Sequence, residues 1–218
     1  FLLDSRKFEA RTLDYSDVRP VHISEVPKGS IYQALDAAWK KKPNRRSDYH
    51  AMATGRFHEG TFYLFRTVRA KRAPREARTL MRLEHHAWLP LWGASPRKVW
   101  VEKTVIHLDE LRGLFRQLGK ADPELGLGRL PLFAYKPRGT KDVRAVAIEH
   151  LVSTGRFVLV EGTGDWQNDF IEEAEAFPGS KWDDQVDAVS ALVTRLWRMP
   201  GGPGTKKPST AKDAPKIK

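Results

Sequence analysis

The sequence contains no cysteine, and this absence excludes disulfide bonds and thiolate metal sites from the 218-residue chain. It has no run of 18 apolar residues, which a membrane-spanning helix needs, and no signal-peptide pattern at its start. The chain is therefore compatible with a reducing compartment, and we expect no membrane partner. It begins at Phe1 rather than Met, which we interpret as the start of a fragment or of a processed product.

Acidic residues are scarce relative to basic ones. The chain has 27 Asp and Glu against 38 Lys and Arg, a formal net charge of +11. Such an excess is typical of proteins that bind polyanions, and nucleic acid is the first candidate. Two segments concentrate the charge, "KKKPNRR" (40–46) and "RTVRAKRAPR" (66–75). The first supplies the candidate phosphate contacts Lys40, Lys41, Lys42, Arg45 and Arg46. Ordinary solvated loop charge is the alternative.

Apolar periodicity predicts a mixed α/β fold. An initial meander of three strands, the last two joined into a hairpin by the short connection "HEG" (58–60), is followed by alternating helices and strands and then by a closing helix. This order predicts a mixed β-sheet with helices on both faces. The expected strands are 30–36, 49–57, 61–70, 97–102, 130–135 and 156–161, and the expected helices are 74–86, 104–119, 140–155, 165–177 and 184–198.

The closing helix begins in "KWDDQVDAVSAL", which places Asp183, Asp184 and Asp187 within five positions. Carboxylates this close repel one another unless a partner neutralises them. In one interpretation Asp184 caps the helix and Asp187 is the acid at the third helical position, where the helix dipole favours negative charge. In the other interpretation the three carboxylates face a divalent cation.

Two further acids stand where predicted strands end. Asp36 ends the strand in "YQALDAAW", and Glu102 ends the strand in "KVWVEKT". An acid beside an apolar run is costly to bury without a partner, and functional sites in open α/β sheets gather at the carboxyl ends of strands. If the two strands are parallel neighbours, Asp36 and Glu102 converge into an oxygen-lined site suited to Mg²⁺ or Mn²⁺. Separate pairing of each acid with a local Lys or Arg is the alternative.

These motifs, in this order, resemble the nuclease domain of the large subunit of tailed-phage terminases. The resemblance rests on "ALDAA" with Asp36, "VWVE" with Glu102, "GTKDVRA", and "FPGSKWDDQVDAVSA", and it covers residues 29–198. The "DDQVDA" box with "FPG" upstream is its most specific part. Relatives often carry His before the paired Asp, where this chain has Trp182.

The resemblance implies a ribonuclease H-like fold and two-metal cleavage of concatemeric DNA with low sequence specificity during viral genome packaging. It implies a site built from Asp36, Glu102, Asp184 and Asp187, with Asp183 as a cap or an additional ligand, and two Mg²⁺ or Mn²⁺ ions as cofactors. Lys141 and Arg144, in "TKDVRA", become candidate DNA contacts, with ordinary helix-surface charge as their alternative. The implied partners are double-stranded DNA and, in full-length relatives, an ATPase motor, a small terminase subunit and the portal, in the host cell cytoplasm.

The phosphate-binding loop of such a motor is absent from this sequence, because the only Gly-Lys pair, Gly119-Lys120, is followed by Ala121. We therefore expect a linker at 1–27, one nuclease domain at 28–198, and a disordered basic tail at 199–218. Two alternatives stay open. One is another ribonuclease H-like nuclease such as a Holliday-junction resolvase, and the other is a non-catalytic basic DNA-binding or assembly module.

Overall fold

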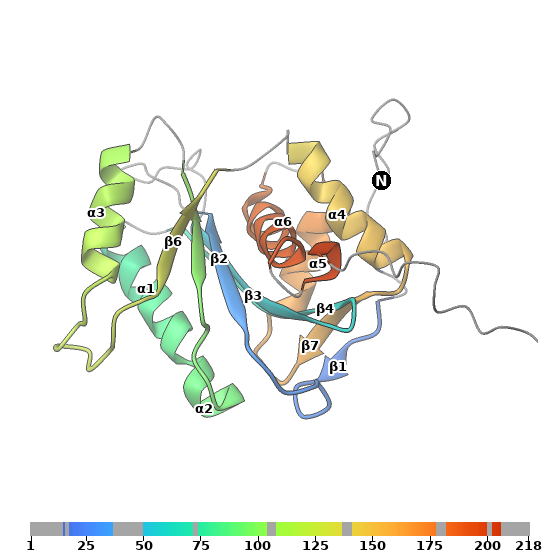
Figure 1. Ribbon diagram of the computed structural model, residues 1–218, viewed down its shortest axis with the longest axis horizontal. Helices are drawn as coiled ribbons and strands as arrows, with labels where there is room; N and C mark the ends of the chain where they lie inside the picture. The colour runs from blue at the N-terminus through green and yellow to red at the C-terminus, as the bar shows by residue number, and fades with distance from the viewer. Residues whose placement is uncertain are drawn as a thin grey trace, which may run out of the picture.

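The protein is described by a computed structural model that covers residues 15, 18–36, 50–71, 74–103, 108–136, 141–177, 182–199 and 202–205. Within these residues one seven-stranded sheet has the strand order β1-β7-β4-β3-β2-β5-β6 (Figure 1). The strands are β1 (Val21–His22), β2 (Tyr32–Asp36), β3 (His50–His58), β4 (Thr61–Ala70), β5 (Val99–Glu102), β6 (Leu132–Tyr135) and β7 (Phe157–Glu161). The helices are α1 (Pro74–His86), α2 (Trp88–Trp92), α3 (Leu108–Leu118), α4 (Lys141–Ser153), α5 (Gln167–Glu175), α6 (Asp184–Trp197) and the short 3₁₀ helix η3 (Pro203–Thr205).

The sheet is mixed because β3 runs against both of its neighbours. β3 pairs antiparallel with β2 and β4, whereas β2 and β5, β5 and β6, β4 and β7, and β1 and β7 pair in parallel. β3 and β4 form the predicted hairpin, whose two turn residues Glu59 and Gly60 have φ of 48° and 86°. Positive φ at both positions is the geometry that matches the right-handed twist of two paired strands.

Helices cover both faces of this sheet, as the sequence predicts. Figure 1 shows α1, α2 and α3 on one side of the strands and α4, α5 and α6 on the other. On the first side, Leu35 and Val101 from the strands pack with Met81 of α1 and Leu114 of α3. This packing uses alternate strand positions, so the intervening residues face the opposite layer.

The second face is covered mainly by α6. Ala34 of β2 and Trp100 of β5 belong to the same buried cluster as Val189 and Leu192 of α6. α6 also packs against α4 and α5, and every residue from Asp184 to Val193 is buried. The helix is therefore enclosed on several sides, and its polar first turn is buried together with its apolar residues.

The sheet extends into the segment expected to be a linker. Val21 and His22 form β1 beside β7, and Tyr15 and Val26 are buried. Burial raises the pKa of the Tyr15 phenol, which lies edge-on to Phe157. At the other end, η3 contacts α6 within the expected tail. The domain boundaries at 28 and 198 stay a prediction.

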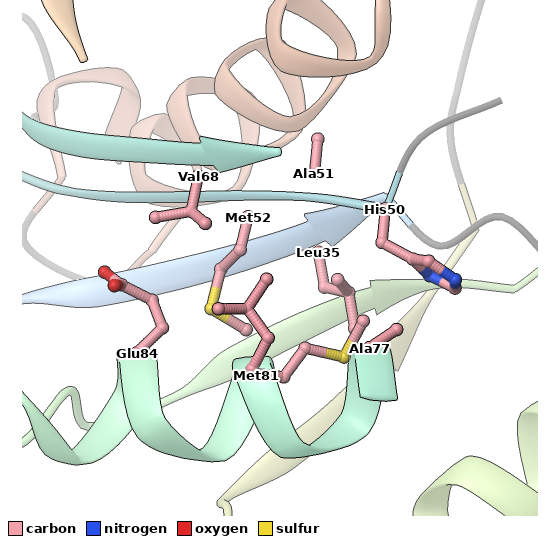
Figure 2. Close-up of a pocket in the computed structure, with 9 residues that line it drawn as sticks. Leu35, His50, Ala51, Met52, Val68, Ala77, Met81 and Glu84 are labelled. Carbon is pink, nitrogen blue, oxygen red and sulfur yellow. The ribbon is translucent and has the colours of Figure 1, made fainter. Parts of the chain in front are cut away.

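A small cavity lies between α1 and the sheet, on the face opposite to α6. Figure 2 shows Met81 of α1 pointing toward Leu35 and Met52 of the strands, with His50 and Glu84 at the two ends. The cavity volume is about 10 Å³. This is at the lower limit of the space that one water molecule needs, so the cavity is a packing gap rather than a ligand site.

No helix in the described part of the chain is both long and apolar enough to span a bilayer.

Candidate active site

Asp36 and Glu102 end two neighbouring parallel strands. β2 and β5 are paired up to Leu35 and Val101, and Asp36 and Glu102 are the next residue on each strand. Since Ala34 and Trp100 face α6 and side chains alternate along a strand, both acids lie on the α6 face of the sheet. Adjacent strands are about 4.8 Å apart, so the two acids are neighbours, and both are partly buried.

The start of α6 carries the other predicted acids. Asp183 is the N-cap residue, and Asp184 and Asp187 lie in the first turn, each with only 5% of its surface exposed. Gln185 accepts a hydrogen bond from the hydroxyl of Thr67, three residues before the end of β4. Because β2 and β4 are both antiparallel to β3, they end at the same edge of the sheet. α6 therefore begins close to the edge at which Asp36 lies.

The interpretation of Asp184 as the helix cap is wrong. Asp184 is the first helical residue, and the side chain of the N-cap residue Asp183 makes no capping hydrogen bond. The cap comes from α5 instead: Glu173 Oε1 accepts the backbone N–H of Gln185 at 2.6 Å and that of Val186 at 3.1 Å. A carboxylate from a neighbouring helix thus satisfies two of the N–H groups that a helix start leaves open.

Glu173 is itself held by two side-chain donors. Arg69 Nη1 on β4 and Gln185 Nε2 each donate to Glu173 Oε2 at 2.9 Å. Only 4% of the Glu173 surface is exposed, so the carboxylate depends on these donors for its solvation. Sequence analysis missed this residue. The signal was an acid between Phe170 and Ala174, on the apolar face of the predicted helix 165–177.

The predicted DNA contacts are only partly visible. Lys40, Lys41, Lys42, Arg45 and Arg46 lie outside the described residues. Lys141 and Arg144 lie in the first turn of α4, which follows β6 along the chain, and their side chains also lie outside the description. Lys71, which lies in the basic segment 66–75, follows β4 and places its ammonium 4.8 Å from the centre of the Trp182 ring. Trp182, directly before the paired Asp183 and Asp184, therefore stacks under this lysine.

A second, larger hollow of about 250 Å³ borders the start of α6. Arg66 and Arg69 of β4, Asp169 of α5 and Gln185 of α6 contribute to its walls. β4 and β7 are parallel neighbours in the sheet. The chain passes from β4 to α1 on one face and from β7 to α5 on the other, so the hollow lies where the connections after two neighbouring strands leave the sheet in opposite directions. Such points are the usual location of ligand crevices in open α/β sheets.

The chemistry of the candidate ligands fits a divalent metal, although they do not form a closed set. All five predicted ligands are carboxylates, the oxygen donors that Mg²⁺ and Mn²⁺ prefer. Asp36 and Glu102 are brought side by side, and Asp184 and Asp187 are buried at the start of a helix on the same face. Among the residues that the structure describes, no three His, Asp or Glu side chains form a group that could hold a metal ion.

Several tryptophans and one histidine of α1 belong to the buried core. Trp88, Trp92 and Trp100 are at most 5% exposed. His85 is buried on α1, with Nδ1 2.9 Å from Gln33 Oε1. Burial, with a contribution from His86, lowers the pKa of His85 to about 4. His107 lies outside the described residues.

No protein-family model matches the chain, and no curated protein matches it. Solved structures do match. The nuclease domain of the human cytomegalovirus terminase aligns over 78% of this chain and 83% of its own, with a TM-score of 0.52 and 15% identity. A manganese-soaked form of the same domain aligns over 82% and 89%, with a TM-score of 0.51 and 14% identity.

The large terminase of a thermophilic bacteriophage, in complex with ADP, covers 85% of this chain with a TM-score of 0.52 and 10% identity. This chain spans 44% of the length of that protein. At such low identities the comparisons show a shared fold and nothing more. The chain has the ribonuclease H-like α/β fold of terminase nuclease domains, as predicted.

Proposed function

We propose that this chain is the nuclease domain of a viral DNA-packaging terminase and acts as a metal-dependent endodeoxyribonuclease. The observation that carries the proposal is the pairing of β2 with β5, which makes the strand-end acids Asp36 and Glu102 neighbours on the face that α6 covers. The fold likeness to terminase nuclease domains supports a packaging nuclease at the level of architecture.

In this proposal Asp36, Glu102, Asp184 and Asp187 hold two Mg²⁺ or Mn²⁺ ions, and Asp183 supports them. Two such ions, when bound, supply a water nucleophile of lowered pKa and stabilise the charge on the leaving oxygen. The use of manganese in a cytomegalovirus nuclease-domain structure is consistent with this assignment. The protein contributes fixed ligands, since the strands and α6 hold the four carboxylates before substrate arrives.

The basic residues bind the substrate in this proposal. Lys141 and Arg144 lie in the first turn of α4, which follows the edge strand β6 beside β5. Lys40, Lys41, Lys42, Arg45 and Arg46 come directly after β2 in the chain and so follow the Asp36 edge. Contacts of this type to phosphates carry no sequence information, which suits cleavage with low specificity. The proposal also implies that the full-length protein has an ATPase motor domain and acts with a small terminase subunit and the portal in the host cell cytoplasm.

A second candidate is a basic DNA-binding module without catalysis. It is favoured by one observation, that the described acids do not form a closed group for a metal. Incubation of the chain with supercoiled plasmid, with and without Mn²⁺, separates the two functions. Nicking and linearisation that require Mn²⁺ support the nuclease, whereas plasmid binding without any cleavage supports the module. Cleavage restricted to branched substrates would instead indicate a Holliday-junction resolvase.

A further inference from the structure

The start of α6 is tied to two other elements by one buried network. Glu173 of α5 accepts the N–H groups of Gln185 and Val186 through one oxygen. Its other oxygen accepts from Arg69 of β4 and from the Gln185 side chain. Gln185 Oε1 in turn accepts the Thr67 hydroxyl at 2.7 Å, which closes the connection back to β4.

The helix that supplies Glu173 is itself fixed against the sheet. Phe170 is fully buried and stacks on Phe157 of β7, with ring centroids 6.3 Å apart and an angle of 14° between the rings. Ala174 is fully buried one position after Glu173. The carboxylate therefore projects from a rigid element, which is what holding a neighbouring group in one orientation requires.

The hydrogen bonds to Gln185 and Val186 fix the rotation of α6 about its own axis. Successive side chains of an α-helix are about 100° apart around its axis, so sliding the chain by one residue past Glu173 would bring different side chains to the same face. Asp184 and Asp187 flank the two capped residues, so the direction in which they face depends on where Glu173 holds the chain. Because Asp183 makes no side-chain cap, the helix start has no local device of that kind.

We propose that Glu173 is a positioning residue, which sets the orientation of the α6 carboxylates toward Asp36 and Glu102 without touching metal or substrate. This inference rests on the proposed nuclease function. Arg69 balances the charge of Glu173 and fixes the rotamer of its side chain. Thr67 and Gln185 link the same unit to β4, so the orientation of the acids is coupled to the sheet rather than to α5 alone.

The test compares Glu173→Gln with Glu84→Gln. Glu84 is also a buried acid with an arginine partner, since Arg66 Nη2 lies 2.8 Å from Glu84 Oε2, but it lies on α1 across the sheet. Both substitutions replace a buried carboxylate by an amide of nearly the same shape. Only Glu173→Gln changes the cap of α6. A purely structural role predicts that both variants lose stability and that both keep the metal affinity of the wild type.

The dissociation constant of Mn²⁺ is measured by electron paramagnetic resonance of free Mn²⁺, and the Mn²⁺ concentration for half-maximal plasmid cleavage is measured alongside it. Groups that orient metal ligands typically change metal affinity 10-fold to 100-fold when replaced. We therefore expect Glu173→Gln to raise both quantities by about tenfold. We expect Glu84→Gln to leave both unchanged at a temperature where circular dichroism shows all proteins folded.

Thr67→Val serves as a second variant, since it removes only the hydroxyl bond to Gln185 and keeps the side-chain shape. It should also raise both quantities, but by less than Glu173→Gln does. If Glu173→Gln does not fold, Thr67→Val decides whether the network positions the acids. Wild-type values in every folded variant, with the wild type cleaving normally, would overturn the positioning role and leave the nuclease function standing. A wild type that neither binds Mn²⁺ nor cleaves would overturn the proposed function, and this inference with it.

Discussion

Asp36 and Glu102 each stand one residue beyond a parallel pair, Leu35 with Val101, at the ends of two adjacent strands. The sheet thereby holds two carboxylates side by side on the face covered by α6. Their mutual repulsion is tolerable if a cation lies between them or if hydrogen bonds solvate them. This relationship is the basis of the predictions that concern metal and catalysis.

The first prediction concerns metal-linked stability. Mn²⁺ at 100 times its dissociation constant should stabilise the wild-type fold by about 2.7 kcal/mol. Asp184→Asn should lose most of that gain, because it removes an anionic ligand while Glu173 keeps the helix capped. Differential scanning calorimetry with and without Mn²⁺ measures the effect, and Asp109→Asn on exposed α3 is the control. Equal metal-induced shifts in all three proteins would remove Asp184 from the site.

The second prediction concerns DNA contacts on α4. Replacing Lys141 and Arg144 together by Ala should weaken binding equally for DNAs of different sequence. It should also lower the slope of log affinity against log salt concentration by about 2, because each phosphate contact contributes about 0.9. Fluorescence anisotropy at several salt concentrations, with metal omitted, provides the measurement. An unchanged slope would assign both residues to ordinary surface charge.

The third prediction concerns His85, which is buried on α1 beside Gln33. Its pKa is lowered from 6.5 to about 4, so the unfolded chain binds the proton more readily than the folded chain. Stability is therefore complete above pH 6.5 and falls as the pH drops toward 4, by at most about 3 kcal/mol. His85→Asn retains a donor toward Gln33 without the titration and should flatten this part of the curve.

Urea unfolding between pH 4 and 7 measures the difference between wild type and His85→Asn. Carboxylate titration affects both proteins, so it cancels in the comparison. His22→Asn, at an exposed residue of β1, is the matched control and should follow the wild type. A wild type and a His85→Asn variant that lose stability in parallel would contradict the assignment.

Signals within a few residues of each other correctly predicted the helices and strands that start or turn at a specific residue. Pro74 begins α1 as expected, since the missing N–H of proline costs nothing at a helix start, and "HEG" predicted the β3–β4 hairpin. The strand-end positions of Asp36 and Glu102 were also predictable, because a short, mainly apolar run marks each strand and an acid ends it.

Features that depend on contacts between distant segments were not predictable. β1 is two residues long and exists because Val21 pairs with Val160, which is far away in the sequence. α2 was not predicted, since "WLPLW" has no helical period of its own and is fixed by burial of Trp88 and Trp92. The cap of α6 was assigned to the nearest acid, because the sequence does not show that α5 brings Glu173 to the helix start.

The central claim is that Asp36 holds a catalytic metal, and it is tested most directly by plasmid cleavage with Asp36→Asn in Mn²⁺. The matched control is Asp109→Asn, a substitution of the same kind at an exposed acid paired with Arg112. Wild type and Asp109→Asn should cleave at the same rate. Asp36→Asn should lose at least about 100-fold, the range expected when a group that stabilises transition-state charge is removed, with an unchanged circular dichroism spectrum. Wild-type cleavage by a folded Asp36→Asn would contradict the account.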